Sequence, residues 1–87
     1  MEIIYSLKAI EDISYWKKSG NKAVQEKISA LLDDIVKHPY TGIGKPEALK
    51  HQLSGSWSRR ITRTHRLVYS VNIENNTIEI ETARGHY

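Results

Sequence analysis

The hydrophobic pattern of this chain changes from a helical period in its first half to a strand period in its second. Between residues 22 and 37 the apolar residues recur at i, i+4, i+7, i+8, i+11 and i+12, and they are Val24, Ile28, Leu31, Leu32, Ile35 and Val36. This spacing forms a single apolar stripe along an α-helix. From residue 51 onward, apolar and polar residues alternate as in half-buried strands. The order of the two patterns predicts an α+β fold, with two N-terminal helices packed on one face of a twisted, mainly antiparallel sheet.

Capping residues and proline mark the ends of the expected helices. Residues 1–6 predict a short strand, and Ser6 is a suitable N-cap for the helix that follows. The apolar positions of that helix recur at helical spacing and the charged positions occupy other faces; they are Leu7, Ile10, Ile13 and Trp16 against Glu11, Asp12, Lys17 and Lys18. Gly20 predicts its end. Pro39 predicts the end of the second helix, because proline disfavours the α conformation in the residue before it.

The length of 87 residues predicts one domain, residues 1–87. A domain of this size buries only about 60–65% of its unfolded surface, so a tight partner or a second copy would stabilise it. Without cysteine the chain has no disulfide, no thiolate nucleophile and no cysteine metal site. The start shows no signal peptide, and apolar runs fall far short of the roughly 20 residues of a membrane span. We therefore expect a cytoplasmic protein that does not bind a membrane.

Positive charge is concentrated in one part of the chain. Residues 45–66 contain a single acid, Glu47, and six bases, which are Lys45, Lys50, Arg59, Arg60, Arg63 and Arg66. The modest formal net charge of +3 therefore conceals a strongly basic segment. Clustering of this kind predicts a polyanionic partner, and nucleic acid is the simplest one.

The arginines of this segment divide between two faces of an expected strand. Because side chains alternate along a strand, Arg59 and Arg63 share one face and Arg60 takes the other. The face that also carries Trp57 is expected to be partly directed at the core, so Arg60 is favoured for the open face. Arg66 joins Arg60 there if the next strand pairs through a tight turn. Arginine suits phosphate because it stays charged and binds it through two hydrogen bonds, although arginines on strands can also simply keep an exposed face soluble.

Glu47 and His86 are the candidate proton-transfer groups. Neighbouring cations keep a carboxylate such as Glu47 ionised and able to accept a proton, although a solvated loop acid has the same surroundings. The imidazole of His86 can donate a proton near neutral pH, and Tyr87 can stack on a base, although both could be ordinary tail residues. The remaining histidines have no metal-ligand spacing, so no metal site is expected. From the residues alone, a small basic nucleic-acid-binding domain is favoured over an enzyme.

Several longer motifs resemble one family of bacterial toxins. The chain contains GIGKPEALKH at residues 42–51, LSGSWSRRI at residues 53–61, HRLVY at residues 65–69 and a terminal His86-Tyr87. Together with the opening strand and helix, these motifs strongly resemble the YoeB (Txe) toxins of the RelE-like superfamily, over the whole chain. The resemblance implies the RelE-like microbial RNase fold.

The resemblance also implies an activity, which is ribosome-dependent cleavage of mRNA in the A site without metal or other cofactor. Glu47 would be the general base that removes the ribose 2′-hydroxyl proton, and Arg66 would stabilise charge on the scissile phosphate. His86 would be the general acid for the 5′-oxygen, with Tyr87 orienting the base or substrate. Which of His86 and Tyr87 is the true acid stays open. The first product would be a 2′,3′-cyclic phosphate.

The resemblance further implies a set of binding residues and partners. The expected phosphate-binding residues are Lys45, Lys50, Arg59 and Arg60. The expected partners are a cognate antitoxin of the YefM/Axe type and the ribosome with its mRNA; operator DNA would be bound only through the antitoxin complex, and a homodimer is possible. The alternative function is a non-catalytic basic module that binds the ribosome, or operator DNA together with its antitoxin.

Overall fold

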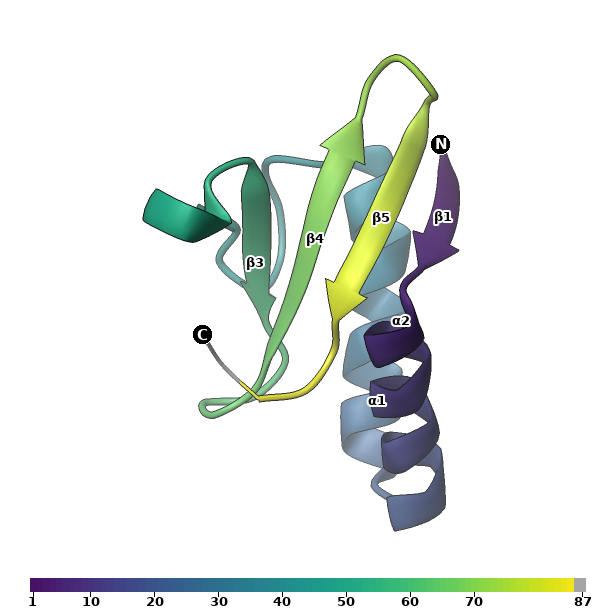
Figure 1. Cartoon of the computed structure of the whole chain (residues 1–87). Helices are drawn as coiled ribbons and strands as arrows, with labels where there is room; N and C mark the ends of the chain where they lie inside the picture. The colour runs from purple at the N-terminus through teal and green to yellow at the C-terminus, as the bar shows by residue number, and fades with distance from the viewer. Residues whose placement is uncertain (86–87) are drawn as a thin grey trace.

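The computed structural model describes residues 1–85, which form a two-helix layer and a five-stranded sheet (Figure 1). In chain order the elements are β1 (Glu2–Tyr5), α1 (Leu7–Ser19), α2 (Lys22–Lys37), β2 (Glu47–Ala48), a 3-10 helix (His51–Leu53), β3 (Ser56–Arg60), β4 (Arg66–Asn72) and β5 (Thr77–Thr82). The strand order is β1-β5-β4-β3-β2, in which β1 pairs parallel to β5 and the other pairs are antiparallel. The predicted α+β class with a mainly antiparallel sheet is confirmed.

The helix ends lie where the capping residues predict them. The Ser6 Oγ accepts a hydrogen bond from the Ala9 N–H at 3.0 Å, and the Asn21 side chain caps α2 in the same way. Gly20 closes α1 in the left-handed conformation with φ of 74°. These local bonds satisfy backbone donors that a helix end leaves unpaired. The short connection at Gly20 makes α1 and α2 an antiparallel pair.

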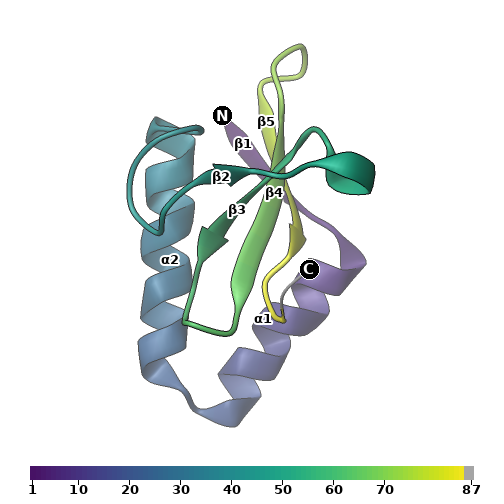
Figure 2. The same ribbon diagram turned by 90° about the vertical axis from the view of Figure 1, so that its left-hand side faces the viewer.

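The apolar stripe of α2 forms the centre of the core. Val24, Ile28, Leu31 and Ile35 are all buried, and they belong to one cluster with buried residues of β4 and β5. Figure 2 shows α2 running alongside the sheet, with α1 packed against the lower end of the strands. The opposite face of the sheet is therefore available for a site. Neither helix in the described chain is long and apolar enough to cross a membrane.

The predicted faces of α1 are confirmed at Ile13 and Trp16, which pack in the core, but wrong at three other positions. Leu7 and Ile10 are 80% and 53% exposed, whereas Asp12, expected on a polar face, is only 3% exposed. The Asp12 carboxylate accepts the Ala83 N–H at 2.9 Å and forms an ion pair with Lys8. A buried carboxylate is tolerated when its oxygens are hydrogen-bonded in this way. The apolar spacing alone misassigned this face because the bond that buries Asp12 comes from the other end of the chain.

Candidate functional site

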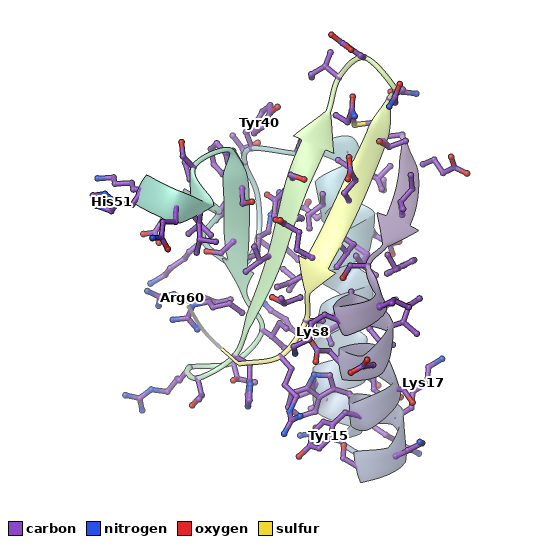
Figure 3. All side chains as sticks on the ribbon, viewed as in Figure 1. Lys8, Tyr15, Lys17, Tyr40, His51 and Arg60 are labelled. Atoms are coloured by element: carbon purple, nitrogen blue, oxygen red, sulfur yellow. The ribbon has the colours of Figure 1, made fainter. Side chains whose placement is uncertain are left out.

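A small polar pocket lies where β2, β3 and β4 meet. Its volume is about 230 Å³, and its lining residues are Lys45, Pro46, Glu47, Ser58, Arg60 and Arg66. The sheet register explains the grouping, because Glu47 is paired with Ser58 and Arg60 is paired with Arg66. Directly paired residues point to the same face, as do residues two apart on one strand. The pocket is thus on the face opposite to α2, and Figure 3 shows Arg60 on the side of the sheet away from α1.

Two cations lie directly opposite each other in this pocket. Arg60 is exposed and Arg66 is partly buried. The Arg66 Nη1 donates to the carbonyl oxygens of Thr62, Arg63 and His65, at 3.0, 3.2 and 3.2 Å. Like charges opposite each other on neighbouring strands are unfavourable, and the turn holds this pair in place. A bound anion would relieve the repulsion, so the pair is suited to a phosphate. The prediction that Arg66 joins Arg60 on one face is confirmed.

The lysines divide between two positions. Lys45 lines the pocket and takes the left-handed conformation with φ of 52°. Lys50 is exposed at the start of the 3-10 helix and does not line the pocket. The structure therefore brings Lys45 to the carboxylate of the site and leaves Lys50 on the neighbouring surface.

A second basic hollow adjoins the first and adds one base, Lys27, from outside the basic segment 45–66. It has a volume of about 340 Å³, and Lys45 and Arg60 line it together with Lys27 and Arg63. Lys27 lies on α2, and no sequence pattern connects it with the basic segment 45–66. Its position is a consequence of how α2 packs beside the end of β3. The basic surface is thus wider than the sequence indicates.

The prediction that Arg59 binds phosphate is wrong. Its side chain is fully buried, with 0% exposure. All five N–H groups of the guanidinium have partners within the chain: Nε donates to the Tyr69 hydroxyl, Nη1 to the Asp34 carboxylate and the Ile43 carbonyl, and Nη2 to the carbonyls of His38 and Thr41. Five donors are the full capacity of arginine. No donor and no surface remain for a substrate.

Arg59 instead ties down the loop that leads to the pocket. The carbonyls it binds belong to residues 38–43, and the Tyr69 hydroxyl donates to the Pro39 carbonyl at 2.6 Å. The loop passes so close to α2 that a Cβ at Gly42 would lie 1.9 Å from the Asp34 carboxylate. The Arg60 N–H then donates to the Gly44 carbonyl at 2.7 Å. These contacts fix the position of the backbone that leads into Lys45 and Glu47.

The ionisable members of this network have shifted pKa values. The hydrogen bond from Arg59 lowers the pKa of the Asp34 carboxyl below its ordinary value of 3.8. Burial raises the pKa of the Tyr69 hydroxyl above its ordinary value of 10.0. Both shifts favour the same state, an ionised Asp34 beside a protonated Tyr69, over the neutral range of pH.

The pH dependence of unfolding is expected to follow from the lowered pKa of Asp34. A carboxyl whose pKa is lower in the folded chain adds stability above its ordinary pKa of 3.8. That stability is lost as the pH falls through the lower value of the folded state. We expect Asp34→Asn to have a lower Tm at neutral pH but a flatter decline of Tm below 3.8 than the wild type. Thermal unfolding followed by circular dichroism at a series of pH values measures both.

The neighbouring acid Asp33 provides the control for this experiment. It is exposed, and the Asp33→Asn variant should therefore reproduce the wild-type decline. Parallel declines in Asp34→Asn and wild type would show that Asp34 does not contribute to acid unfolding.

His86 and Tyr87 lie outside the described residues. The chain approaches the pocket just before them, because the Arg66 N–H donates to the Gly85 carbonyl at 2.8 Å. Among residues 1–85, no group of three or more His, Asp or Glu side chains is arranged to hold a metal ion. The charged groups that the described chain offers at this site are one carboxylate, Glu47, and three cations, Lys45, Arg60 and Arg66.

Comparison with known proteins gives one consistent result. Residues 5–87 match a family model described as the YoeB-like toxin of bacterial type II toxin-antitoxin systems. Toxin YoeB of Escherichia coli is 45% identical over 87 residues, which is the full length of both chains. Among solved structures, the YoeB/ParE toxin from Agrobacterium tumefaciens superposes with a TM-score of 0.95 at 37% identity, again over the full length of both.

A further group of solved structures comes from Staphylococcus aureus. A heterotetrameric complex of the YoeB-YefM toxin-antitoxin contains a chain 42% identical to this one, with a TM-score of 0.88 and coverage of 100% and 98%. A YoeB dimer from the same organism gives the same values. These relatives cover the whole pocket described above.

Proposed function

Since the chain belongs to the YoeB-like toxins of bacterial type II toxin–antitoxin systems, we propose that it cleaves messenger RNA bound to the ribosome. The proposed reaction is a metal-independent attack of a ribose 2′-hydroxyl on the adjacent phosphate, in the ribosomal A site. The observation that supports it is a single pocket in which the carboxylate of Glu47 lies with the paired arginines Arg60 and Arg66. A base, an acid and a cationic clamp are the minimum for this chemistry, and the residues of this pocket offer the base and the clamp.

Each bond change has a residue assigned to it in the proposed reaction. Glu47 removes the proton from the 2′-hydroxyl as its oxygen bonds to phosphorus. Arg66, together with Arg60, stabilises the negative charge on the pentacoordinate phosphorane. The bond from phosphorus to the 5′-oxygen then breaks, and His86 or Tyr87 gives that oxygen a proton. The products are a 2′,3′-cyclic phosphate and a 5′-hydroxyl, and DNA is excluded because it lacks the attacking group.

The remaining basic residues bind the phosphates that flank the scissile one. Lys45 reaches both hollows, and Lys50 extends the surface on the side of the 3-10 helix. So small a pocket cannot by itself orient the 2′-hydroxyl and the scissile phosphate of the RNA. In the proposed reaction the ribosome does so, since it already holds the codon in a fixed conformation. Fixing two reacting groups in this way is worth up to several orders of magnitude in rate.

The proposed partners follow from the relatives in Staphylococcus aureus, which include a YoeB-YefM heterotetramer and a YoeB dimer. We propose a cognate antitoxin of the YefM type for this chain and a cytoplasmic location shared with the ribosome. An acidic antitoxin segment that covers Arg60 and Arg66 would inhibit by occlusion. Operator DNA would be bound only through the antitoxin complex.

The test is cleavage of a programmed mRNA on purified bacterial ribosomes, with both new ends mapped. We expect a cut at a fixed position in the A site, an upstream fragment that ends in a cyclic or open 2′/3′-phosphate, and a downstream 5′-hydroxyl. The reaction should be unaffected by a metal chelator at concentrations that leave the ribosome intact.

Intact mRNA together with stoichiometric binding to the ribosome would reject catalysis. It would support the alternative, a non-catalytic basic module, which the wide basic surface of Lys27, Lys45, Arg60 and Arg63 also favours. Salt dependence does not separate the two, because both involve contacts with phosphates.

A further inference from the structure

The last described residues extend beyond the sheet and are held mainly by side chains. The final paired residue of β5 is Thr82, opposite Val68 of β4. Directly after it, the Ala83 N–H donates to the Asp12 carboxylate and the Ala83 carbonyl accepts the Trp16 Nε1–H, both at 2.9 Å. Ala83 is fully buried. Figure 1 shows this end of the chain passing beside α1.

Two further contacts continue this attachment. The Arg84 guanidinium carbon lies 3.5 Å from the centre of the Tyr15 ring, a cation–π contact. The Gly85 N–H donates to His65 Nδ1 at 2.8 Å, and the Gly85 carbonyl accepts the Arg66 N–H at 2.8 Å. Gly85 has φ of 82°, a conformation that other residues rarely adopt. The chain is therefore fixed up to the residue before His86.

His65 is itself rigidly placed. Its backbone N–H donates to the Thr62 Oγ1 at 3.0 Å, and its carbonyl accepts the Ile61 N–H at 2.9 Å. Its ring meets Trp16 edge-on, with centroids 4.9 Å apart and an interplanar angle of 84°. The backbone N–H of Gly85 can only donate, so Nδ1 must be the unprotonated nitrogen and Nε2 must carry the hydrogen. The contact to Gly85 thus requires a neutral imidazole in one tautomer.

We infer that His65 is a positioning residue for the C-terminal pair His86-Tyr87, holding Gly85 beside Arg66 so that the proton donor is delivered to the pocket. This inference rests on the proposed function, which assigns the donor role to those two residues. The physical reason is distance, because each residue after the last fixed one adds about 3.8 Å between Cα atoms. With Gly85 anchored, His86 directly follows a residue whose backbone is hydrogen-bonded to Arg66, the proposed phosphate ligand. Without the anchor, the nearest fixed point is Ala83.

Two variants separate the hydrogen bond from the ring packing. His65→Asn keeps an acceptor close to the position of Nδ1 but removes the ring. His65→Phe keeps a ring against Trp16 but removes the acceptor. We expect His65→Phe to lower the single-turnover cleavage rate by about 10²-fold, since small misplacements of a reacting group have effects of that order. We expect His65→Asn to stay within about 10-fold of the wild type, and both to bind ribosomes with unchanged affinity.

A second readout does not depend on catalysis. Amide hydrogen exchange at Gly85, followed by NMR, should be slow in wild type and His65→Asn and fast in His65→Phe, with Tm recorded for all three. Equal cleavage rates for His65→Phe and wild type, or equal losses in both variants, would overturn the positioning role. A wild type that does not cleave would instead reject the proposed function. Exchange at Gly85 would then still decide whether His65 anchors the chain.

Discussion

Replacing Glu47 with glutamine is expected to lower the rate of mRNA cleavage on the ribosome by about 10²–10⁴-fold, the usual contribution of a general base. Glutamine matches the shape of glutamate but cannot accept the 2′-hydroxyl proton at neutral pH. Glu47 is exposed, so the fold should survive the change. The measurement is single-turnover cleavage with saturating enzyme, which separates the chemical step from binding.

Glu74 supplies the matched control for this variant. It lies in the exposed turn between β4 and β5, far along the chain from the pocket, and Glu74→Gln has the same charge change. We expect Glu74→Gln to cleave like wild type and both variants to keep the wild-type Tm. Full activity in Glu47→Gln would show that another group is the base. If Glu47→Gln still arrests growth fully without cleaving mRNA, the toxic function is binding alone.

Replacing Arg59 with methionine is expected to lower the free energy of unfolding by about 3–5 kcal/mol, as removal of one member of a buried charged network does. The change leaves the Tyr69 hydroxyl and three loop carbonyls without the donor that they have in the wild type. For a domain of this size, the Tm should fall by more than about 10 °C. Thermal and urea unfolding, followed by circular dichroism, measure the loss.

The same substitution at the adjacent Arg60 serves as the control, and we expect it to affect function rather than stability. Arg60 is exposed and lines the pocket, so Arg60→Met should change the Tm little and weaken cleavage or RNA binding instead. Arg59→Lys adds a third comparison, because lysine keeps the charge but offers three donors where arginine offers five. A folded Arg59→Lys with slow cleavage would show that the loop positions Glu47. Equal stability of Arg59→Met and wild type would disprove the network.

The strand pattern predicted more of the site than the charge pattern did. Alternation along β3 places Arg60 on the open face, and the tight turn to β4 places Arg66 opposite it, both as expected. The same alternation places Arg59 on the core face with Trp57. The set of phosphate ligands taken from the resemblance nevertheless included Arg59. The structure shows why this arginine is buried, since all five of its donors have acceptors within the chain.

The sequence by itself determined where α1, α2 and the longer strands lie, where the caps are, and that Arg60 and Arg66 share a face. These features depend on bonds and periodicities that span only a few neighbouring residues. The expectation that Arg63 shares the face of Arg59 is wrong, because β3 ends at Arg60 and Arg63 borders the same hollow as Arg60. Only the tertiary structure decided which charges are buried and which residues border the pocket. Asp34 and Arg59 are 25 positions apart, and Asp12 and Ala83 are 71 apart. Such pairs are decided by how α1 and α2 pack against the sheet, and no local pattern records them.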